Sequence, residues 1–204
     1  EKESKTACIE AEKVLVSVGR KANLSQVGLD KLNIELLRNG VKVDEYMQTS
    51  HPRVYACGDI TGHSMLAHTA IRESEVAVNH ILGVEDRMNY DCVPGVVYTN
   101  PEVAGVGKTE EELKASGISY HVQKLPMAYS GRFVAENELV NGLCKLILDD
   151  DDRVIGCHML GNPVSELIVL AGLAVQHGYT VEEFQKIVFP HPTVGEIFHE
   201  TLFA

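Results

Sequence analysis

The chain has 204 residues, of which 45% are hydrophobic and 23% charged, a composition typical of a globular protein with one or two domains. Its formal net charge of -11 argues against nucleic acid or an acidic membrane as a partner, because both require a basic surface. No apolar run approaches the roughly 18 residues of a membrane span. Because the sequence opens at Glu1 without an initiator Met or a signal peptide, we expect it to be a piece of a longer chain.

Three strands are expected in the first part of the chain, at residues 13–18, 41–43 and 53–57. The first is a β-branched run that stops at Gly19, a pattern typical of a strand buried on both faces. The third ends at Gly58 and Asp59, and ligand sites favour such strand ends. A parallel sheet is therefore predicted for this part.

A helix is predicted over residues 66–82, where apolar residues recur at helical spacing and Gly83 supplies the stop. Around residues 90–94 the pattern changes from alternating strand and helix to a strand-rich region. We therefore place a domain boundary there.

The second part of the chain predicts an α+β domain with helices on one face of an antiparallel sheet. Strands are expected at residues 96–98, 103–106, 119–125, 143–148 and 153–160. Helices are expected at residues 109–117, 164–177, 180–187 and 196–202. Thr109 with Glu112, and Thr180 with Glu183, have the spacing of capping boxes. The acidic connection 149–152 between two alternating runs predicts a hairpin.

The most chemically informative segment is the turn that contains His191. Pro190 and Pro192 restrict the backbone on either side of it, so its ring is expected to project from a rigid turn. Glu196 could accept the proton of one ring nitrogen, which leaves the other nitrogen basic. Three interpretations are open at this point: a surface turn, an acid/base site, and a metal-site fragment in which Glu196 and His199 take part.

Five cysteines are odd in number and widely spaced, and none forms a Cys-x-x-Cys pair. This pattern favours a reducing compartment. The apolar settings of Cys144 and Cys157 indicate small buried side chains, and no cysteine is predicted to have a redox role.

Four strings in this order resemble those of the pyridine nucleotide-disulfide oxidoreductases. They are Val18-Gly19-Arg20, Val54-Tyr55-Ala56-Cys57-Gly58-Asp59, Tyr98-Thr99-Asn100-Pro101-Glu102, and His191-Pro192-Thr193 with Glu196. Within that family, Met65-Leu66-Ala67-His68 and Asn89-Tyr90-Asp91-Cys92-Val93-Pro94 are most similar to strings of the members that oxidise dihydrolipoamide. The resemblance covers essentially the whole chain.

The resemblance implies FAD and NAD as cofactors and no metal. Asp59 would accept hydrogen bonds from the ribityl chain of FAD, although a carboxylate there is also a common N-cap. Met65, Leu66, Ala67 and His68 would place the first N–H groups of a helix near the flavin ring, where they favour negative charge. Gly19 would contact NAD.

In the same family, His191 would be the general base that removes a thiol proton, with Glu196 as its orienting partner. That histidine reaches the disulfide and flavin of a second subunit, so a homodimer is implied. The expected partner is a lipoyl domain of a 2-oxo acid dehydrogenase or glycine cleavage complex, in the bacterial cytoplasm or the mitochondrial matrix.

The implied organisation is an α/β remnant of the nucleotide-binding domains followed by a C-terminal α+β dimerisation domain. Residues 1–21 would end the NAD-binding domain, 22–90 would be the C-terminal part of the FAD-binding and central region, and 91–204 would form the dimerisation domain. Neither G-x-G-x-x-G nor Cys-x-x-x-x-Cys is present, so we expect the chain alone to be inactive. Two alternatives stay open: a related glutathione-type disulfide reductase, and a non-catalytic dimerisation module.

Overall fold

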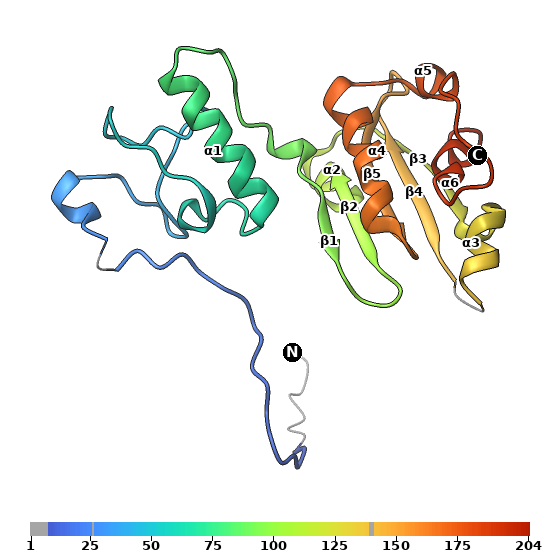
Figure 1. Ribbon diagram of the computed structural model, residues 1–204, viewed down its shortest axis with the longest axis horizontal. Coiled ribbons are helices and arrows are strands. Elements are labelled where there is room, and N and C mark those ends of the chain that lie inside the picture. The colour runs from blue at the N-terminus through green and yellow to red at the C-terminus, as the bar shows by residue number, and fades with distance from the viewer. Residues whose placement is uncertain (1–7, 26, 139–140) are drawn as a thin grey trace. The chain divides into compact units, whose positions relative to one another are not determined.

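The computed structural model describes residues 8–25, 27–138 and 141–204. The chain divides into two compact units, the first ending at Met88 and the second beginning at Asn89 (Figure 1). Across these described ranges, no helix is long and apolar enough to cross a membrane. The division into three functional domains, at residues 1–21, 22–90 and 91–204, stays a prediction.

The first unit is built around helix α1, Ala67–Ile81, which confirms the helix predicted there. The buried residues of α1 recur at helical spacing and so lie on one face; they are Thr69, Glu73, Val76 and Ala77. Two short 3-10 helices, η1 at Leu29–Leu32 and η2 at Gly58–Thr61, lie in the same unit, and η2 contacts α1. The unit therefore brings the Gly58-Asp59 turn against a helix.

The prediction of three strands in the first unit is wrong. Residues 13–18 are extended but belong to no strand, and Leu15 is 92% exposed. The segments 41–43 and 53–57 take part only in isolated bridges, such as that between Gln48 and Tyr55. A strand exists only where a neighbour supplies hydrogen bonds along its length, and the described part of the chain offers these segments no such neighbour.

The second unit contains a five-stranded antiparallel sheet. Its strands are β1 Gly95–Val97, β2 Val103–Gly107, β3 His121–Pro126, β4 Leu143–Leu148 and β5 Val154–Leu160. The order across the sheet is β1-β2-β5-β4-β3. The predicted hairpin is confirmed, since β4 and β5 pair antiparallel with Leu146 opposite Cys157.

In the described part of the second unit, five helices accompany the sheet. They are α2 Glu110–Ser116, α3 Gly131–Glu136, α4 Val164–His177, α5 Val181–Gln185 and α6 Glu196–Thr201, with short 3-10 helices at Tyr90–Cys92 and Met127–Tyr129. Both predicted capping boxes are present. Helix α5 stops two residues before the expected end at Ile187, and α3 was not predicted, because only the cap at Ser130 marks it.

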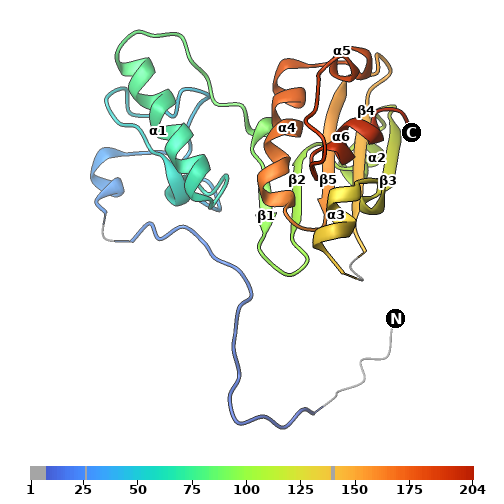
Figure 2. The same ribbon diagram turned by 45° about the vertical axis from the view of Figure 1, so that its right-hand side comes forward.

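Helix α4 packs on β2 and β5, and α6 on β3 and β4, so both cover the same face of the sheet (Figures 1 and 2). Core side chains from β4 and β5 that point toward them include Cys144, Leu146 and Cys157. Both cysteines there are fully buried, in agreement with their predicted role as small core residues.

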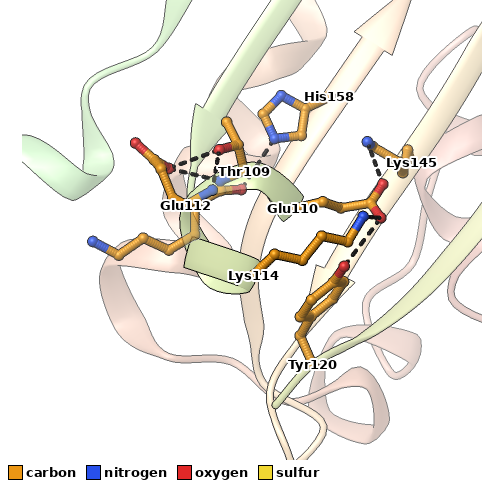
Figure 3. Close-up of polar contacts among 8 residues, drawn as sticks. Thr109, Glu110, Glu112, Lys114, Tyr120, Lys145 and His158 are labelled. Carbon is orange, nitrogen blue, oxygen red and sulfur yellow. Dashed lines mark hydrogen bonds and ion pairs between the residues drawn. The ribbon is translucent and has the colours of Figure 1, made fainter. Parts of the chain in front are cut away.

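Helix α2 lies on the opposite face of the sheet, so the prediction that all helices share one face is wrong. Side chains alternate along a strand, and Lys145 stands between core residues Cys144 and Leu146, so it points away from the core. Its ammonium group lies 2.9 Å from the carboxylate of Glu110, the first residue of α2 (Figure 3). A short helix is thereby tied to the face that α4 and α6 leave open.

Candidate functional site

The turn between α5 and α6 brings His191 and Glu196 together. The distance from Nδ1 of His191 to Oε1 of Glu196 is 2.8 Å, and the second carboxylate oxygen accepts the N–H of Thr193 at 2.7 Å. The His191 side chain is 81% exposed, whereas that of Glu196 is 21% exposed. The carboxylate is thus held at the base of the turn, and the imidazole projects outward from it.

The turn is fixed to the domain by hydrogen bonds and by buried apolar residues. The Thr193 hydroxyl donates to the carbonyl of Pro190 at 2.8 Å, and the buried hydroxyl of Ser130 donates to the carbonyl of Thr193 at 3.1 Å. Ile197 and Phe198, in the first turn of α6, are fully buried in the core. Ser130 was missed by the sequence analysis, since it lies 63 residues from its partner.

The electrostatics of the pair favour a carboxylate rather than a carboxylic acid. Hydrogen bonds from the Thr193 N–H and from His191 lower the pKa of Glu196 below its ordinary value, so this group is ionised at neutral pH. An ionised carboxylate only accepts hydrogen bonds, so Nδ1 of His191 carries the proton. Nε2 is then the basic nitrogen, and it belongs to an exposed ring.

A metal site that uses Glu196 and His199 is not supported by their surroundings. Nε2 of His199 lies 3.3 Å from the carbonyl oxygen of Gln185, and its ring contacts those of Phe189 and Phe203. Within the described ranges, no group of three or more His, Cys, Asp or Glu residues could hold a metal ion. His199 is therefore a packing residue, and Glu196 is paired with His191.

An apolar cavity of about 530 Å³ lies beside the His191 turn. Pro190, Thr193 and Gly195 line it from the turn. The remaining walls come from α4 and from the segment that leads into the turn, namely Leu167, Leu170, Leu173, His177, Tyr179, Phe184, Ile187, Val188 and Phe189. The spacing of the three leucines was a signal in the sequence, but a stripe of this kind ordinarily indicates core packing.

In the first unit, Asp59 is an exposed residue of η2, which contacts α1. Helix α1 begins after Leu66, an N-cap whose side chain makes no capping hydrogen bond, and the first N–H groups of the helix belong to Ala67 and His68. A carboxylate that accepts hydrogen bonds, in the same unit as the N–H donors of a helix start, suits a ligand that carries both hydroxyl groups and negative charge.

Two further predicted residues lie in the same unit. The guanidinium of Arg20 donates to the carbonyl of Met65 at 3.3 Å, which brings residues adjacent to Gly19 close to the start of α1. Gly19 itself has φ +116°, a conformation that favours glycine. Arg20 was not among the predicted site residues, although it sits in the same string. The structure thus brings together two strings that lie 45 residues apart.

Two family profiles match this chain. The pyridine nucleotide-disulphide oxidoreductase dimerisation domain matches residues 93–202, and the pyridine nucleotide-disulphide oxidoreductase profile matches residues 1–74. Mitochondrial dihydrolipoyl dehydrogenases from Caenorhabditis elegans and Homo sapiens are each 39% identical, over 100% and 98% of the chain. The chain spans about 40% of the length of these curated relatives.

The fold of the chain is also similar to that of solved structures. LpdA from Mycobacterium tuberculosis superposes with a TM-score of 0.83 and 28% identity, over 90% of this chain and 40% of that one. The HOCl-induced flavoprotein disulfide reductase RclA from Escherichia coli gives a TM-score of 0.79 at 23% identity, over 92% of this chain and 44% of that one, and supports the fold alone.

Proposed function

Because the chain belongs to the pyridine nucleotide-disulphide oxidoreductase family, we propose that it is part of an FAD-dependent dihydrolipoamide dehydrogenase that passes electrons to NAD. The observation that carries the proposal is the 2.8 Å contact between His191 and Glu196, with the basic nitrogen on an exposed ring. The names of the relatives that are 39% identical support dihydrolipoamide as the substrate.

His191 acts as a general base on the dithiol. Its Nε2 takes the proton of a thiol, which leaves a thiolate as the nucleophile toward a disulfide. The imidazolium that forms is stabilised by the carboxylate of Glu196, which is already ionised because the Thr193 N–H and His191 lower its pKa. The carboxylate also selects the tautomer, since it accepts from Nδ1 only.

The residues of the first unit fit the binding of FAD. Asp59 would accept hydrogen bonds from hydroxyl groups of the cofactor. The N–H groups of Met65 and Leu66, which precede α1, and of Ala67 and His68, its first residues, would face the electron-rich ring of the cofactor. Gly19, which has no side chain, would allow NAD to approach the polypeptide backbone closely. When bound, FAD accepts the two electrons of the dithiol and delivers them to NAD.

We place the working site between two copies of the protein. The exposed imidazole lies beside an apolar cavity in a domain that matches the family's dimerisation profile, so His191 would serve the disulfide and flavin of the partner subunit. The substrate would arrive on a lipoyl domain of a 2-oxo acid dehydrogenase or glycine cleavage complex. Mitochondrial relatives favour the matrix as the compartment, and a bacterial source would place the protein in the cytoplasm.

The test is the variant His191→Gln in the full-length protein, with dihydrolipoamide-dependent NADH formation as the measurement. We expect kcat to fall by about 10²-fold or more, as for removal of a general base, with the flavin absorbance unchanged. His121→Gln is the matched control, because His121 also pairs with a carboxylate, Asp152, at 2.9 Å in the same unit. Undiminished turnover by His191→Gln would contradict the role of His191 as general base. Reduction of glutathione disulfide by a protein that does not oxidise dihydrolipoamide would contradict the proposed substrate.

A further inference from the structure

Glu73 is a carboxylate buried in the first unit. It lies on the inner face of α1 with 0% of its surface exposed. Its Oε2 accepts the backbone N–H of Gly58 at 2.5 Å. Burial of a carboxylate is costly unless hydrogen bonds compensate it, so an apolar residue would be the cheaper choice at a position that only packs. The buried carboxylate of Glu73 is therefore better explained by the group that it binds, the N–H of Gly58, than by packing.

The peptide groups on both sides of Gly58 are held. The Thr61 hydroxyl donates to the Gly58 carbonyl at 3.0 Å, while the N–H goes to Glu73. Gly58 has φ +79°, and a Cβ at this position would lie 3.3 Å from Cβ of Ala70. The turn therefore has a left-handed backbone at close range to α1, and Glu73 anchors it there by a hydrogen bond.

The residue that follows this anchored glycine is Asp59, whose carboxylate is exposed. The helix that supplies Glu73 also begins with the N–H groups of Ala67 and His68, about 8 to 9 Å along its axis from Glu73. Helix α1 thus provides candidate cofactor contacts at its first residues. From its middle, through Glu73, it also holds the turn that carries the second candidate contact, Asp59. The hydrogen bond between Glu73 and Gly58 ties the turn that carries Asp59 to this helix.

We propose that Glu73 is a positioning residue for the cofactor: it fixes the Gly58-Asp59 turn on α1, so that Asp59 and the start of the helix can hold FAD together. The inference rests on FAD as the cofactor of the proposed function. It assigns to Glu73 no contact with FAD and no part in proton transfer. Its action is through the backbone N–H of Gly58.

The test compares Glu73→Ala, Glu73→Gln and Glu73→Asp in the full-length flavoprotein. The measurements are the FAD dissociation constant, the visible flavin spectrum and the melting temperature of the apoprotein. We expect Glu73→Ala to raise the dissociation constant about tenfold or more, as for loss of one buried hydrogen bond of about 1.4 kcal/mol. Glu73→Gln keeps an oxygen acceptor at the same reach and should restore binding. Glu73→Asp keeps the carboxyl group, but its side chain is one methylene too short, so this variant should bind FAD weakly.

Glu75→Ala is the matched control, because Glu75 lies on the same helix, is exposed, and pairs with Arg72 at the surface. Wild-type FAD affinity in Glu73→Ala, with only a lower melting temperature, would overturn the proposal, since that is the pattern of a purely structural residue. Restoration by Asp rather than Gln would overturn it as well. If Glu73→Ala does not fold, the Gln and Asp variants decide. If FAD binding follows the prediction but dihydrolipoamide is not oxidised, the substrate proposal fails and Glu73 keeps its role.

Discussion

At the scale of the residue, Glu196 has two histidines within reach along the sequence and pairs with one. His199 lies three positions on, which is favourable helical spacing, yet its ring nitrogen contacts the Gln185 carbonyl. His191 lies outside the helix, and the turn returns its Nδ1 to 2.8 Å from the carboxylate. The N–H of Thr193 on the other carboxylate oxygen orients the acceptor, so the pair is preorganised.

The variant Glu196→Gln separates orientation from charge. The amide oxygen can still accept from Nδ1, but it carries no negative charge to stabilise the imidazolium, so we expect kcat to fall by about tenfold or more, without exceeding the loss in His191→Gln. The measurement is steady-state, dihydrolipoamide-dependent NADH formation by the full-length protein. Glu200→Gln, an exposed change on the same helix, should be neutral. Equal kcat for Glu196→Gln and wild type would show that the carboxylate has no electrostatic role.

At the scale of the element, α2 shows how a seven-residue helix is kept in place. Its N-terminus has the full capping box of Thr109 and Glu112, which satisfies orphan N–H groups locally. Its docking depends on charge: the carboxylate of Glu110 receives Lys145 from β4, with Lys114 and the hydroxyl of Tyr120 beside it (Figure 3). The cap was visible in the sequence, whereas the contact with β4 was not.

The Glu110 contact predicts a specific pH dependence of stability. Hydrogen bonding and charge attraction by Lys145, with a smaller contribution from Lys114, lower the pKa of Glu110 to about 2. A carboxyl group whose pKa is depressed by folding stabilises the fold above its unfolded pKa of about 4.3, and this contribution is lost as the pH falls toward 2.

Urea unfolding of the wild-type chain and of Glu110→Gln at several pH values between 7 and 2 tests this dependence. We expect the variant to be less stable at pH 7, and the difference to shrink as the pH falls below about 4. Added salt should also reduce the difference at pH 7, since the pair is partly exposed. A difference that is constant with pH would mean that the Lys145 pair does not contribute.

At the scale of the whole molecule, the second unit has apolar surface that its own core does not cover. Val169 and Leu173 of α4 and Ile187 beyond α5 are exposed, and Val188 is 91% exposed. Leu173, Ile187 and Val188 also line the cavity beside the His191 turn. Apolar surface of this kind is characteristic of protein interfaces, in agreement with the dimerisation profile that this part of the chain matches.

The variant Val188→Asp tests the proposed dimer. A charge at this position would have to be buried on association, so we expect the full-length protein to shift from dimer toward monomer and to lose turnover, with flavin still bound. Sedimentation velocity at several protein concentrations measures the shift. Ile118→Asp, an exposed apolar position that follows α2 on the other face of the sheet, is the control. A dimer of undiminished affinity in Val188→Asp would place the interface elsewhere.

Local patterns in the sequence were sufficient to predict α1, α4, both helices with capping boxes, and the hairpin of β4 and β5. Each depends on residues close in sequence: a periodic apolar face, a capping box, a glycine stop, or an acidic turn between alternating runs. The His191 and Glu196 pair belongs to the same class, because its members are only five positions apart in the sequence. Asp59 and the start of α1 were also selected from their strings as cofactor contacts, and that role stays a prediction.

Only the tertiary structure decided how these pieces are held. The segment 13–18 has the composition of a buried strand, but strand formation depends on a hydrogen-bonding neighbour that a local pattern cannot report. Ser130 on the His191 turn, Lys145 on α2 and Glu73 on Gly58 each join segments that are 15 to 63 residues apart. Local sequence specifies which groups are chemically able to act, and the packing of distant segments determines which of them meet.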